Sequence, residues 1–189
     1  MKLAVIGGGS TYTPELIDGI ARLTGDIKVT EVALVDPDES RLSVVGPFSA
    51  RIMRSYGHPA VVRWTSDTDD GLDGAGAVLL QLRVGYQTAR NRDETWPLEC
   101  GCVGQETVGA GGLAKALRTV PVVLDIAERA RQRAAADAWI MPSLSDTRNS
   151  LSSRMRPPCG CAAAVDLTDR SVDFRRRRDN AVNASSKRR

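Results

Sequence analysis

The chain opens on a pattern of apolar and polar residues that predicts a strand, a tight turn and a helix in succession. Lys2 to Ile6 is a short apolar run of the kind that a fully buried strand shows. Glycines at positions 7–9 and the small polar residues after them end this run abruptly. Thr13 is the expected N-cap of a helix, with Pro14 at its first position and Glu15 in its first turn. The helix should therefore begin beside the glycine turn, with its positive dipole end facing that turn.

The apolar pattern predicts four more strands. They are short runs at residues 31–35, 61–65, 77–82 and 138–140. The run at 77–82, AVLLQL, is the most continuously apolar and is typical of a buried strand in a parallel sheet. Strands that alternate with helical segments predict an α/β fold, a Rossmann-like doubly wound parallel sheet.

Two longer helices are expected between these strands. The first ends at Gly57, and Gly46-Pro47 inside it should kink it or divide it in two. Its apolar positions are Leu42, Val45, Ile52 and Met53. The second helix runs from Leu113 to Arg133 and should bend at Pro121. One face of this second helix carries Leu117, Val120, Leu124 and Ala127.

The stretch from Arg83 to Gly112, about 30 residues, has little helical or strand periodicity and is predicted to be a long loop. It follows the carboxyl end of a central strand, which is the edge where such sheets bind ligands. The arginines of this stretch are Arg83, Arg90 and Arg92. They suit a phosphate or a carboxylate, and the alternative is that they pair with Asp93 and Glu94 in a solvated loop.

The glycine turn and the end of the second strand together indicate a dinucleotide site. Glycine lacks Cβ, so the backbone can approach a pyrophosphate closely while free N–H groups donate to it. Asp36 follows Gly9 by some 27 positions, where a dinucleotide-binding unit places the acid that binds the adenosine ribose. Two alternatives stay open: a turn without a ligand, because Tyr12 replaces a small fingerprint residue, and a helix-capping role for Asp36. The candidate cofactor residues are Gly7, Gly8, Gly9, Ser10, Thr11 and Asp36.

Composition fits a globular domain with a tail. Of the 189 residues, 42% are hydrophobic and 4% aromatic. The opening run is too short for a signal peptide, and no apolar stretch approaches the roughly 20 residues of a membrane helix, so we expect a cytoplasmic protein. Residues 1–140 carry 15 Lys and Arg against 18 Asp and Glu, whereas residues 141–189 carry 11 against 5. We therefore predict a domain at 1–140 and a disordered, basic, Ser- and Arg-rich tail at 141–189.

Candidate metal ligands do not form a convincing site. The cysteines form two Cys-Gly-Cys pairs, Cys100 with Cys102 and Cys159 with Cys161. Zinc sites usually separate paired cysteines by two to four residues, so coincidence is the favoured interpretation. The acidic residues Asp67, Asp69, Asp70 and Asp73 lack the glycine and glutamate of a calcium loop and are expected to be solvated. His58, the sole histidine, is predicted to be a surface residue rather than a ligand.

Several ordered motifs in residues 1–140 resemble those of glycoside hydrolase family 4, the NAD-dependent and metal-dependent glycosidases. They are GGGSTYTPEL, LVD, RVG followed by ARNRDE and PL, then GQET, and GAGGLAKALRTVPVVLDIA. GAGG and AKALRTVPV are more similar to the 6-phospho-β-glucosidase branch than to the 6-phospho-α-glucosidase branch. The resemblance implies carbohydrate metabolism, an NAD domain, a phosphorylated sugar as the small-molecule partner, and a homo-oligomer.

The family chemistry that the resemblance implies is a redox route to hydrolysis. Hydride passes from C3 of the sugar to NAD, and the resulting ketone acidifies the C2 proton beside a divalent metal, commonly manganese. Elimination expels the leaving group, water adds, and hydride returns. By carry-over, Gly7, Gly9 and Ser10 contact the pyrophosphate and Asp36 the ribose. Arg90 lies near the sugar phosphate and Glu106 in the metal and substrate pocket, and the candidate substrate residues are Arg83, Arg90 and Glu106.

Beyond Ile140 the sequence departs from the family pattern. Family members continue with an Asn-Pro segment, a Cys-Asn-x-Pro motif and an Asn-His pair that bring the metal ligands, and later with a tyrosine that is the candidate base. Residues 141–189 contain none of these motifs. We therefore assign no metal ligand and no catalytic residue, and we expect a truncated glycosidase that does not complete the reaction.

Two hypotheses account for the basic tail. A frameshift near Met141 would convert a longer gene into an unrelated extension, and the absence of the family motifs from the other two reading frames would refute it. Alternatively, the chain is an NAD-binding module whose tail, with its run Arg175 to Arg178, binds nucleic acid or another polyanion. The lack of interleaved aromatic residues disfavours this second hypothesis. A gel-shift assay that shows no binding at low salt would remove it.

Overall fold

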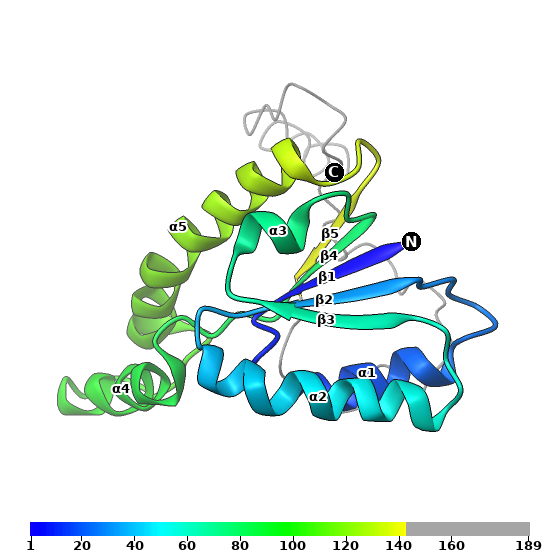
Figure 1. The fold of residues 1–189 in the computed structure, drawn as a ribbon. Helices are drawn as coiled ribbons and strands as arrows, with labels where there is room; N and C mark the ends of the chain where they lie inside the picture. The colour runs from blue at the N-terminus through cyan, green and yellow to red at the C-terminus, as the bar shows by residue number, and fades with distance from the viewer. Residues whose placement is uncertain (143–189) are drawn as a thin grey trace, which may run out of the picture.

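The structure is a computed structural model that describes residues 1–142. At its centre lies a five-stranded sheet in the order β3-β2-β1-β4-β5 (Figure 1). Its strands are β1 (Lys2–Ile6), β2 (Glu31–Val35), β3 (Val61–Thr65), β4 (Ala77–Leu80) and β5 (Trp139–Pro142). All four pairings are parallel, and the central strand β1 aligns Ile6 with Val35 of β2 and with Leu80 of β4. The predicted Rossmann-like parallel sheet is confirmed, and β5 runs two residues past the expected domain boundary at Ile140.

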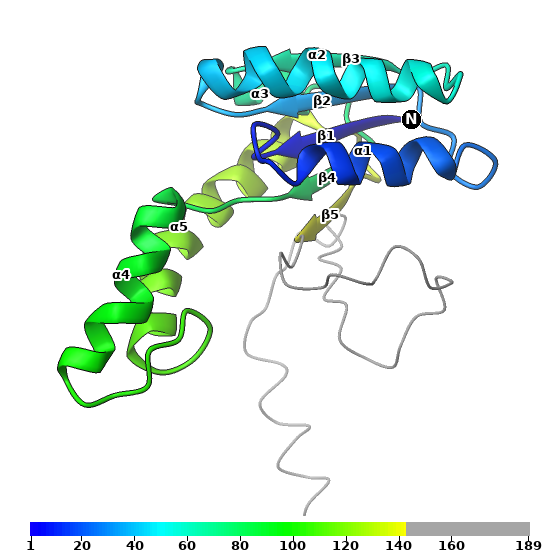
Figure 2. The same ribbon diagram turned by 90° about the horizontal axis from the view of Figure 1, so that it is seen from below.

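Helices cover both faces of the sheet. α1 (Thr13–Arg22) and α2 (Glu39–Ser55) lie on one face, and α3 (Thr68–Leu72) and the later part of α5 (Gly109–Arg133) lie on the other (Figures 1 and 2). α4 (Tyr86–Glu99) packs against α5, and Figure 2 shows the two helices extending away from the sheet. We call α4 with residues 109–121 of α5 the helical arm. The domain is thus a three-layer body with one projecting arm.

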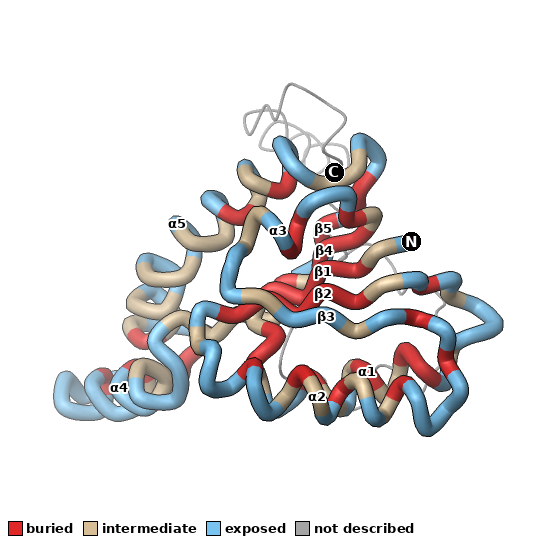
Figure 3. The backbone as a smooth tube through the Cα atoms, viewed as in Figure 1, coloured by how far each residue is buried: buried red, intermediate tan, exposed pale blue. Residues whose placement is uncertain are grey.

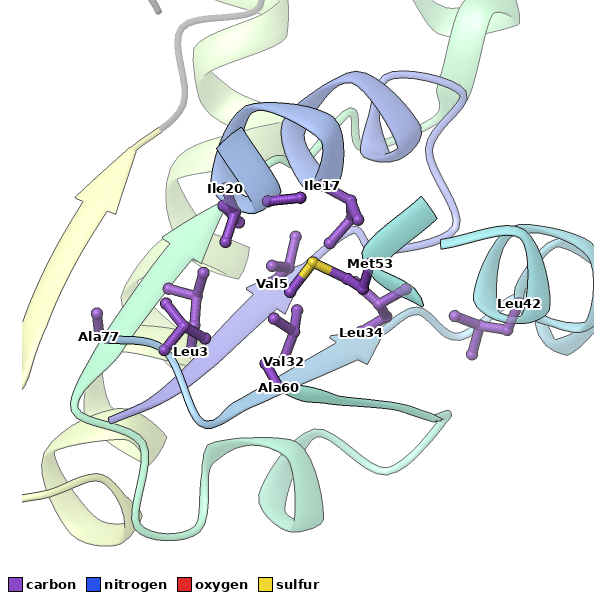
Figure 4. Close-up of a cluster of buried hydrophobic side chains, with 12 residues drawn as sticks. Leu3, Val5, Ile17, Ile20, Val32, Leu34, Leu42, Met53, Ala60 and Ala77 are labelled. Carbon is purple, nitrogen blue, oxygen red and sulfur yellow. The ribbon is translucent and has the colours of Figure 1, made fainter. Parts of the chain in front are cut away.

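The apolar core has two parts, one on each face of the sheet. Leu3 and Val5 of β1 belong to the part beneath α1 and α2, and Ala4 and Ile6 belong to the part beneath α3 and α5. Figure 4 shows the first part, in which Ile17 of α1 lies close to the strand side chains. The central strands are buried along most of their length (Figure 3). Burial on both faces explains why these strands are continuous apolar runs rather than alternating ones.

Two helices were not predicted from the sequence. α3 is a short helix whose N-cap, Asp67, accepts a hydrogen bond from the N–H of Asp69 at 2.9 Å. α4 occupies 14 residues in the middle of the stretch predicted to be a long loop, and Asp93 and Pro97 are its only buried residues. A helix that buries so little has no apolar stripe for a periodicity argument to detect. The long-loop prediction for residues 83–112 is therefore wrong.

Two predicted helix features are also corrected. α1 begins at Thr13 with Tyr12 as its N-cap, because the fully buried Thr13 hydroxyl accepts a hydrogen bond from Nε2 of Gln81 at 3.2 Å instead of capping. α2 is one continuous helix through Gly46-Pro47 and is not divided in two. A Cβ at Gly46 would strike the indole of Trp64, so this glycine lets α2 approach the edge strand β3 closely.

The second long helix, α5, presents its large apolar residues to solvent. Leu117, Val120 and Leu124 are between 51% and 70% exposed. The residues that α5 buries are instead Gly111, Ile126 and Ala130. The sequence thus located the apolar face, and the structure shows that residues 1–142 do not cover it.

The predictions for residues 143–189 lie outside the described part of the chain. These include the disordered basic tail, its proposed polyanion binding, and the pair Cys159 and Cys161. Among the helices of residues 1–142, none combines the length and the apolarity that a membrane crossing requires.

Candidate functional site

The glycine turn lies at the carboxyl edge of the sheet, between β1 and α1 (Figure 1). Gly7 has a φ of +89°, and a Cβ there would strike the carbonyl of Gln81. A Cβ at Gly8 would stand 2.7 Å from a β2 side chain, and one at Gly9 would stand 2.8 Å from Oδ2 of Asp36. Since real Cβ contacts below 3.0 Å are essentially never seen, only glycine fits at these three positions. The turn therefore packs flat against the ends of β2 and β4.

Most N–H groups of this turn already have acceptors within the domain. Those of Gly7 and Gly8 donate to the last carbonyl of β2, both at 2.8 Å, and that of Ser10 donates within the turn at 3.0 Å. The N–H of Gly9 donates to a side chain at 3.0 Å. Over residues 7–11, Thr11 is the exposed residue whose N–H has no acceptor in the described chain. The three glycines therefore let the turn pack closely within the domain, and Thr11 supplies the free donor.

Asp36 is buried where β2 ends and fastens the glycine turn to that strand. Its Oδ2 accepts a hydrogen bond from the N–H of Gly9, and its Oδ1 accepts one from the N–H of Asp38, both at 3.0 Å. Asp38 is the N-cap of α2 and accepts from the N–H of Arg41 at 3.2 Å. The capping alternative therefore applies to Asp38 and not to Asp36. Each oxygen of Asp36 keeps a second lone pair with which it can accept from a ligand hydroxyl.

Tyr12, which departs from the usual glycine fingerprint, causes no packing conflict. Its side chain is exposed at the start of α1, where 50% of the residue is accessible. Thr13 and Ile17 provide the contacts of α1 with the sheet and are fully buried. The close approach of helix and strand is therefore independent of residue 12.

A second group of polar side chains follows β4. Oε2 of the buried Glu106 accepts a hydrogen bond from Arg83 at 2.9 Å and lies 3.4 Å from Nζ of Lys115. Oε1 of Glu106 lies 3.6 Å from Nε of Arg90. The structure therefore brings together the three predicted substrate residues, Arg83, Arg90 and Glu106, and adds Lys115. Arg92 is exposed, and within residues 1–142 it makes no hydrogen bond or ion pair with this group. We call the side chains of Arg83, Arg90, Glu106 and Lys115 the basic cluster.

The predicted pairing of the loop residues with acids is found in part. Arg90 pairs with Glu94 at 2.8 Å. Asp93 is buried and pairs through both oxygens with Arg118, at 3.2 and 2.6 Å, and Arg118 also donates to the carbonyl of Val84 at 2.9 Å. This second pair ties α4 to α5 and to the segment that follows β4. It is therefore a structural contact beside the basic cluster.

Sequence reasoning missed Lys115 and Arg118 as members of this region. Both lie in the motif AKALR on α5, three positions apart, and so on one side of the helix. That spacing was a usable signal, because the apolar residues of the helix occupy a different face. The spacing of Lys115 and Arg118 was not used because residues 83–112 were predicted to be a loop. That prediction left no neighbouring helix for these cations to face.

The space among these side chains is small. The cavity lined by Arg83, Arg90, Glu106 and Lys115 measures about 20 Å³, which is room for about one water molecule. Residues 1–142 therefore do not by themselves enclose a sugar phosphate.

Charge controls the ionisation of Glu106. Burial would raise the pKa of this carboxyl, but the positive charges of Arg83, Lys115 and Arg90 outweigh burial and hold the pKa below its usual value of 4.5. A lowered folded-state pKa stabilises the fold at pH values above the unfolded-state pKa, and this contribution is lost as pH falls through the folded-state pKa. The ionised form is therefore the one present near neutral pH.

Glu106→Gln should lower the free energy of unfolding at pH 7, by about 1–3 kcal/mol, because the cations lose their shared carboxylate. The difference from wild type should stay constant down to about pH 5.5 and shrink below about pH 4.5, where the wild-type carboxyl becomes protonated. Urea unfolding at several pH values measures this difference. Glu128→Gln is the matched control, since Glu128 pairs with Arg131 at 2.6 Å while half exposed, and it should have a smaller effect. A difference that did not change with pH would contradict the assignment.

The described residues do not fit a divalent metal. Residues 1–142 contain no group of three or more His, Cys, Asp or Glu side chains placed to hold an ion. Cys100 and Cys102 are exposed free thiols. His58, predicted to be a surface residue, is instead buried between α2 and β3, and its Nδ1 accepts from the N–H of Ala60 at 3.1 Å. That surface prediction is wrong, and the histidine follows the C-terminal end of α2, whereas the glycine turn lies near the start of that helix.

Comparison with known proteins gives one consistent result. The family model described as family 4 glycosyl hydrolase matches residues 2–144. A probable 6-phospho-β-glucosidase of Bacillus subtilis is 42% identical, and a phospho-α-glucosidase of Clostridium acetobutylicum is 33% identical, each over about three quarters of this chain. A 6-phospho-β-glucosidase structure from Thermotoga maritima, with manganese, NAD⁺ and glucose-6-phosphate, matches with a TM-score of 0.70 and 35% identity, over 76% of this chain and 34% of that one. The chain spans about a third of the length of the curated relatives, 32% for both.

Proposed function

The chain belongs to the family 4 glycosyl hydrolases, and from this premise we propose that residues 1–142 are the NAD-binding domain of a glycosidase that acts on 6-phosphoglucosides. One observation carries the proposal. The glycine turn with Asp36 and the basic cluster both follow the carboxyl ends of neighbouring strands, β1, β2 and β4. A dinucleotide and an anionic substrate would therefore lie beside each other at one edge of the sheet.

NAD fits the first of these two groups. At the glycine turn Thr11 offers a free N–H, and Asp36 offers lone pairs at the end of β2. A carboxylate at this place accepts from both ribose hydroxyls and repels the additional phosphate of NADP. The bound nicotinamide would supply a hydride acceptor, and the protein's part is to fix its position. The NAD⁺ in the Thermotoga relative supports this choice.

The basic cluster suits a phosphorylated sugar. Arg83, Arg90 and Lys115 gather around one buried carboxylate, and Arg90 also pairs with Glu94, so three cationic side chains lie within 4 Å of Glu106. Glu106 keeps them oriented near neutral pH, and arginine in particular can bind a phosphate through two parallel hydrogen bonds. Glucose-6-phosphate in the Thermotoga structure supports a phosphorylated substrate.

We also propose β rather than α specificity. The β-glucosidase of Bacillus subtilis matches this chain at 42% identity and the α-glucosidase of Clostridium acetobutylicum at 33%, over the same part of the fold. The motifs GAGG and AKALRTVPV, which carry the resemblance to the β branch, lie on α5 next to the basic cluster. The motifs that resemble the β branch therefore lie on α5 beside the candidate substrate residues.

A binding experiment tests the proposal with the full 189-residue chain. In saturating NAD⁺, 4-nitrophenyl β-glucoside 6-phosphate should bind at least about tenfold more tightly than its α anomer and than the unphosphorylated β-glucoside. Isothermal titration measures all three. Equal affinity for the two anomers would overturn the β specificity alone, and equal affinity for the unphosphorylated sugar would overturn the phosphate assignment. Release of nitrophenol with Mn²⁺ present would contradict the expectation that residues 141–189 lack the metal ligands and the base.

A further inference from the structure

One contact joins the start of α2 to the start of α4 across the glycine turn. The Arg41 guanidinium carbon lies 4.9 Å from the ring centroid of Tyr86. The stem of Arg41 lies against Gly9. A Cβ added to Gly9 would stand 3.0 Å from Cβ of Arg41 and 2.8 Å from Oδ2 of Asp36. The arginine stem and the proposed ribose acceptor therefore lie side by side against the turn.

Tyr86 is held in an unusual conformation to make this contact. Its φ is +55°, and within residues 1–142 it is the one non-glycine residue with positive φ. Its N–H donates to the carbonyl of Arg83 at 3.0 Å, and Arg118 holds the carbonyl of the neighbouring Val84 at 2.9 Å. Left-handed backbone is unfavourable for a residue with a large side chain, so the surrounding hydrogen bonds must impose it. They place the phenol ring at the edge of the cofactor site.

We propose that Arg41 and Tyr86 form the binding surface for the adenine ring of the dinucleotide. This inference rests on the proposed NAD site and adds to it the two residues that recognise the base. With the adenosine ribose on Asp36, the base extends toward Arg41, which lies against the same glycine. A guanidinium is planar and stacks on aromatic rings, so Tyr86 backs one face of Arg41 while the other receives adenine.

Exposure and charge agree with stacking rather than with phosphate binding. The Arg41 side chain and Tyr86 are each 43% exposed, so both keep surface for a ligand. Arg41 already has a carboxylate partner, Asp38, with Nε and Oδ2 3.5 Å apart. The charge of Arg41 is thus partly balanced by Asp38, and the flat face of its guanidinium is still available for stacking on a base.

Two similar pairs in the domain show that an arginine on an aromatic ring is not by itself a site. Arg22 lies 5.9 Å from the ring of Tyr56, and Arg51 lies 5.2 Å from the ring of Phe48. Neither pair contacts the glycine turn, and neither aromatic residue has positive φ. Tyr56 follows the end of α2 and is 46% exposed, so it is a close match for Tyr86 in type and exposure.

Titration of the full chain with ADP-ribose tests the inference. Tyr86→Ala and Arg41→Leu should each weaken binding about tenfold, the loss that removal of a base-stacking contact typically causes. Tyr86→Phe, which keeps the ring, and the control Tyr56→Ala should stay within about twofold of wild type. The ethenoadenine analogue of ADP-ribose adds a spectroscopic measure, since its fluorescence responds to stacking. That response should be present in wild type and absent in Tyr86→Ala.

Each result has a defined meaning. Wild-type affinity in both Tyr86→Ala and Arg41→Leu would overturn the inference while leaving the NAD site intact. Equal weakening by Tyr56→Ala would overturn it as well, because the effect would then be one of general stability. Failure of wild type to bind ADP-ribose and NAD⁺ would instead overturn the proposed function. If Tyr86→Ala does not fold, Arg41→Leu decides, and affinity within about twofold of wild type would overturn the inference.

Discussion

Asp36→Ala should weaken NAD⁺ binding by at least about 100-fold, because a hydrogen bond to a charged group contributes about 1.5–3 kcal/mol and the ribose has two hydroxyls. The same change removes the acceptor of two N–H groups, those of Gly9 and Asp38. The free energy of unfolding should therefore fall by about 1–3 kcal/mol as well. Isothermal titration measures the affinity, and urea unfolding measures the stability.

Asp67→Ala is the matched control for this variant. Asp67 also follows a strand, β3, and accepts one N–H bond as the N-cap of α3, but it lies at the edge strand of the sheet. Its loss should cost about 1 kcal/mol of stability and leave NAD⁺ affinity unchanged. If Asp67→Ala weakened NAD⁺ binding as much as Asp36→Ala, the loss of affinity would reflect general destabilisation and not a ribose acceptor.

Gly9→Ala should have the second large effect. The added Cβ would stand 2.8 Å from Oδ2 of Asp36 and 3.0 Å from Cβ of Arg41, so the carboxylate or the turn must move. Overpacking of this kind typically costs about 1–3 kcal/mol, and displacement of Asp36 should weaken NAD⁺ binding by about tenfold or more. Titration with NAD⁺ and thermal unfolding check the two parts of this prediction.

Gly25→Ala controls for the loss of glycine itself. An added Cβ at Gly25 would have no heavy atom within 4 Å, and the residue does not have positive φ. This variant should bind NAD⁺ like wild type and be at least as stable, because alanine has less freedom than glycine in the unfolded chain. Wild-type affinity in Gly9→Ala would show that the turn tolerates a side chain and would contradict the packing described for it.

The fold of the sheet could be predicted because its information is local. β1, β2 and β3 occupy the residues that their apolar runs predict, and β4 ends two residues before the end of its run. α4 could not be predicted from pattern, since Asp93 and Pro97 alone are buried in it. Its ion pair to α5 joins Asp93 to Arg118, which lies 25 positions away in the sequence.

The residues of the candidate site likewise fall into those that the sequence predicts and those that only the fold brings together. Gly9 and Asp36 were found because the turn and the strand end have fixed places in this fold, and the structure joins them by a hydrogen bond of 3.0 Å. Lys115 escaped notice because its role depends on α4 lying beside α5. Tyr86 carries no sequence signal at all, since its positive φ is imposed by the hydrogen bonds of neighbouring residues.

The central claim is that residues 1–142 bind NAD through the glycine turn and Asp36. Isothermal titration of the full 189-residue chain with NAD⁺ tests it most directly. We expect saturable binding to one site, with a Kd between about 1 μM and 1 mM and at least about tenfold weaker binding of NADP⁺. Absence of saturable NAD⁺ binding by a folded chain, or equal affinity for NADP⁺, would contradict it.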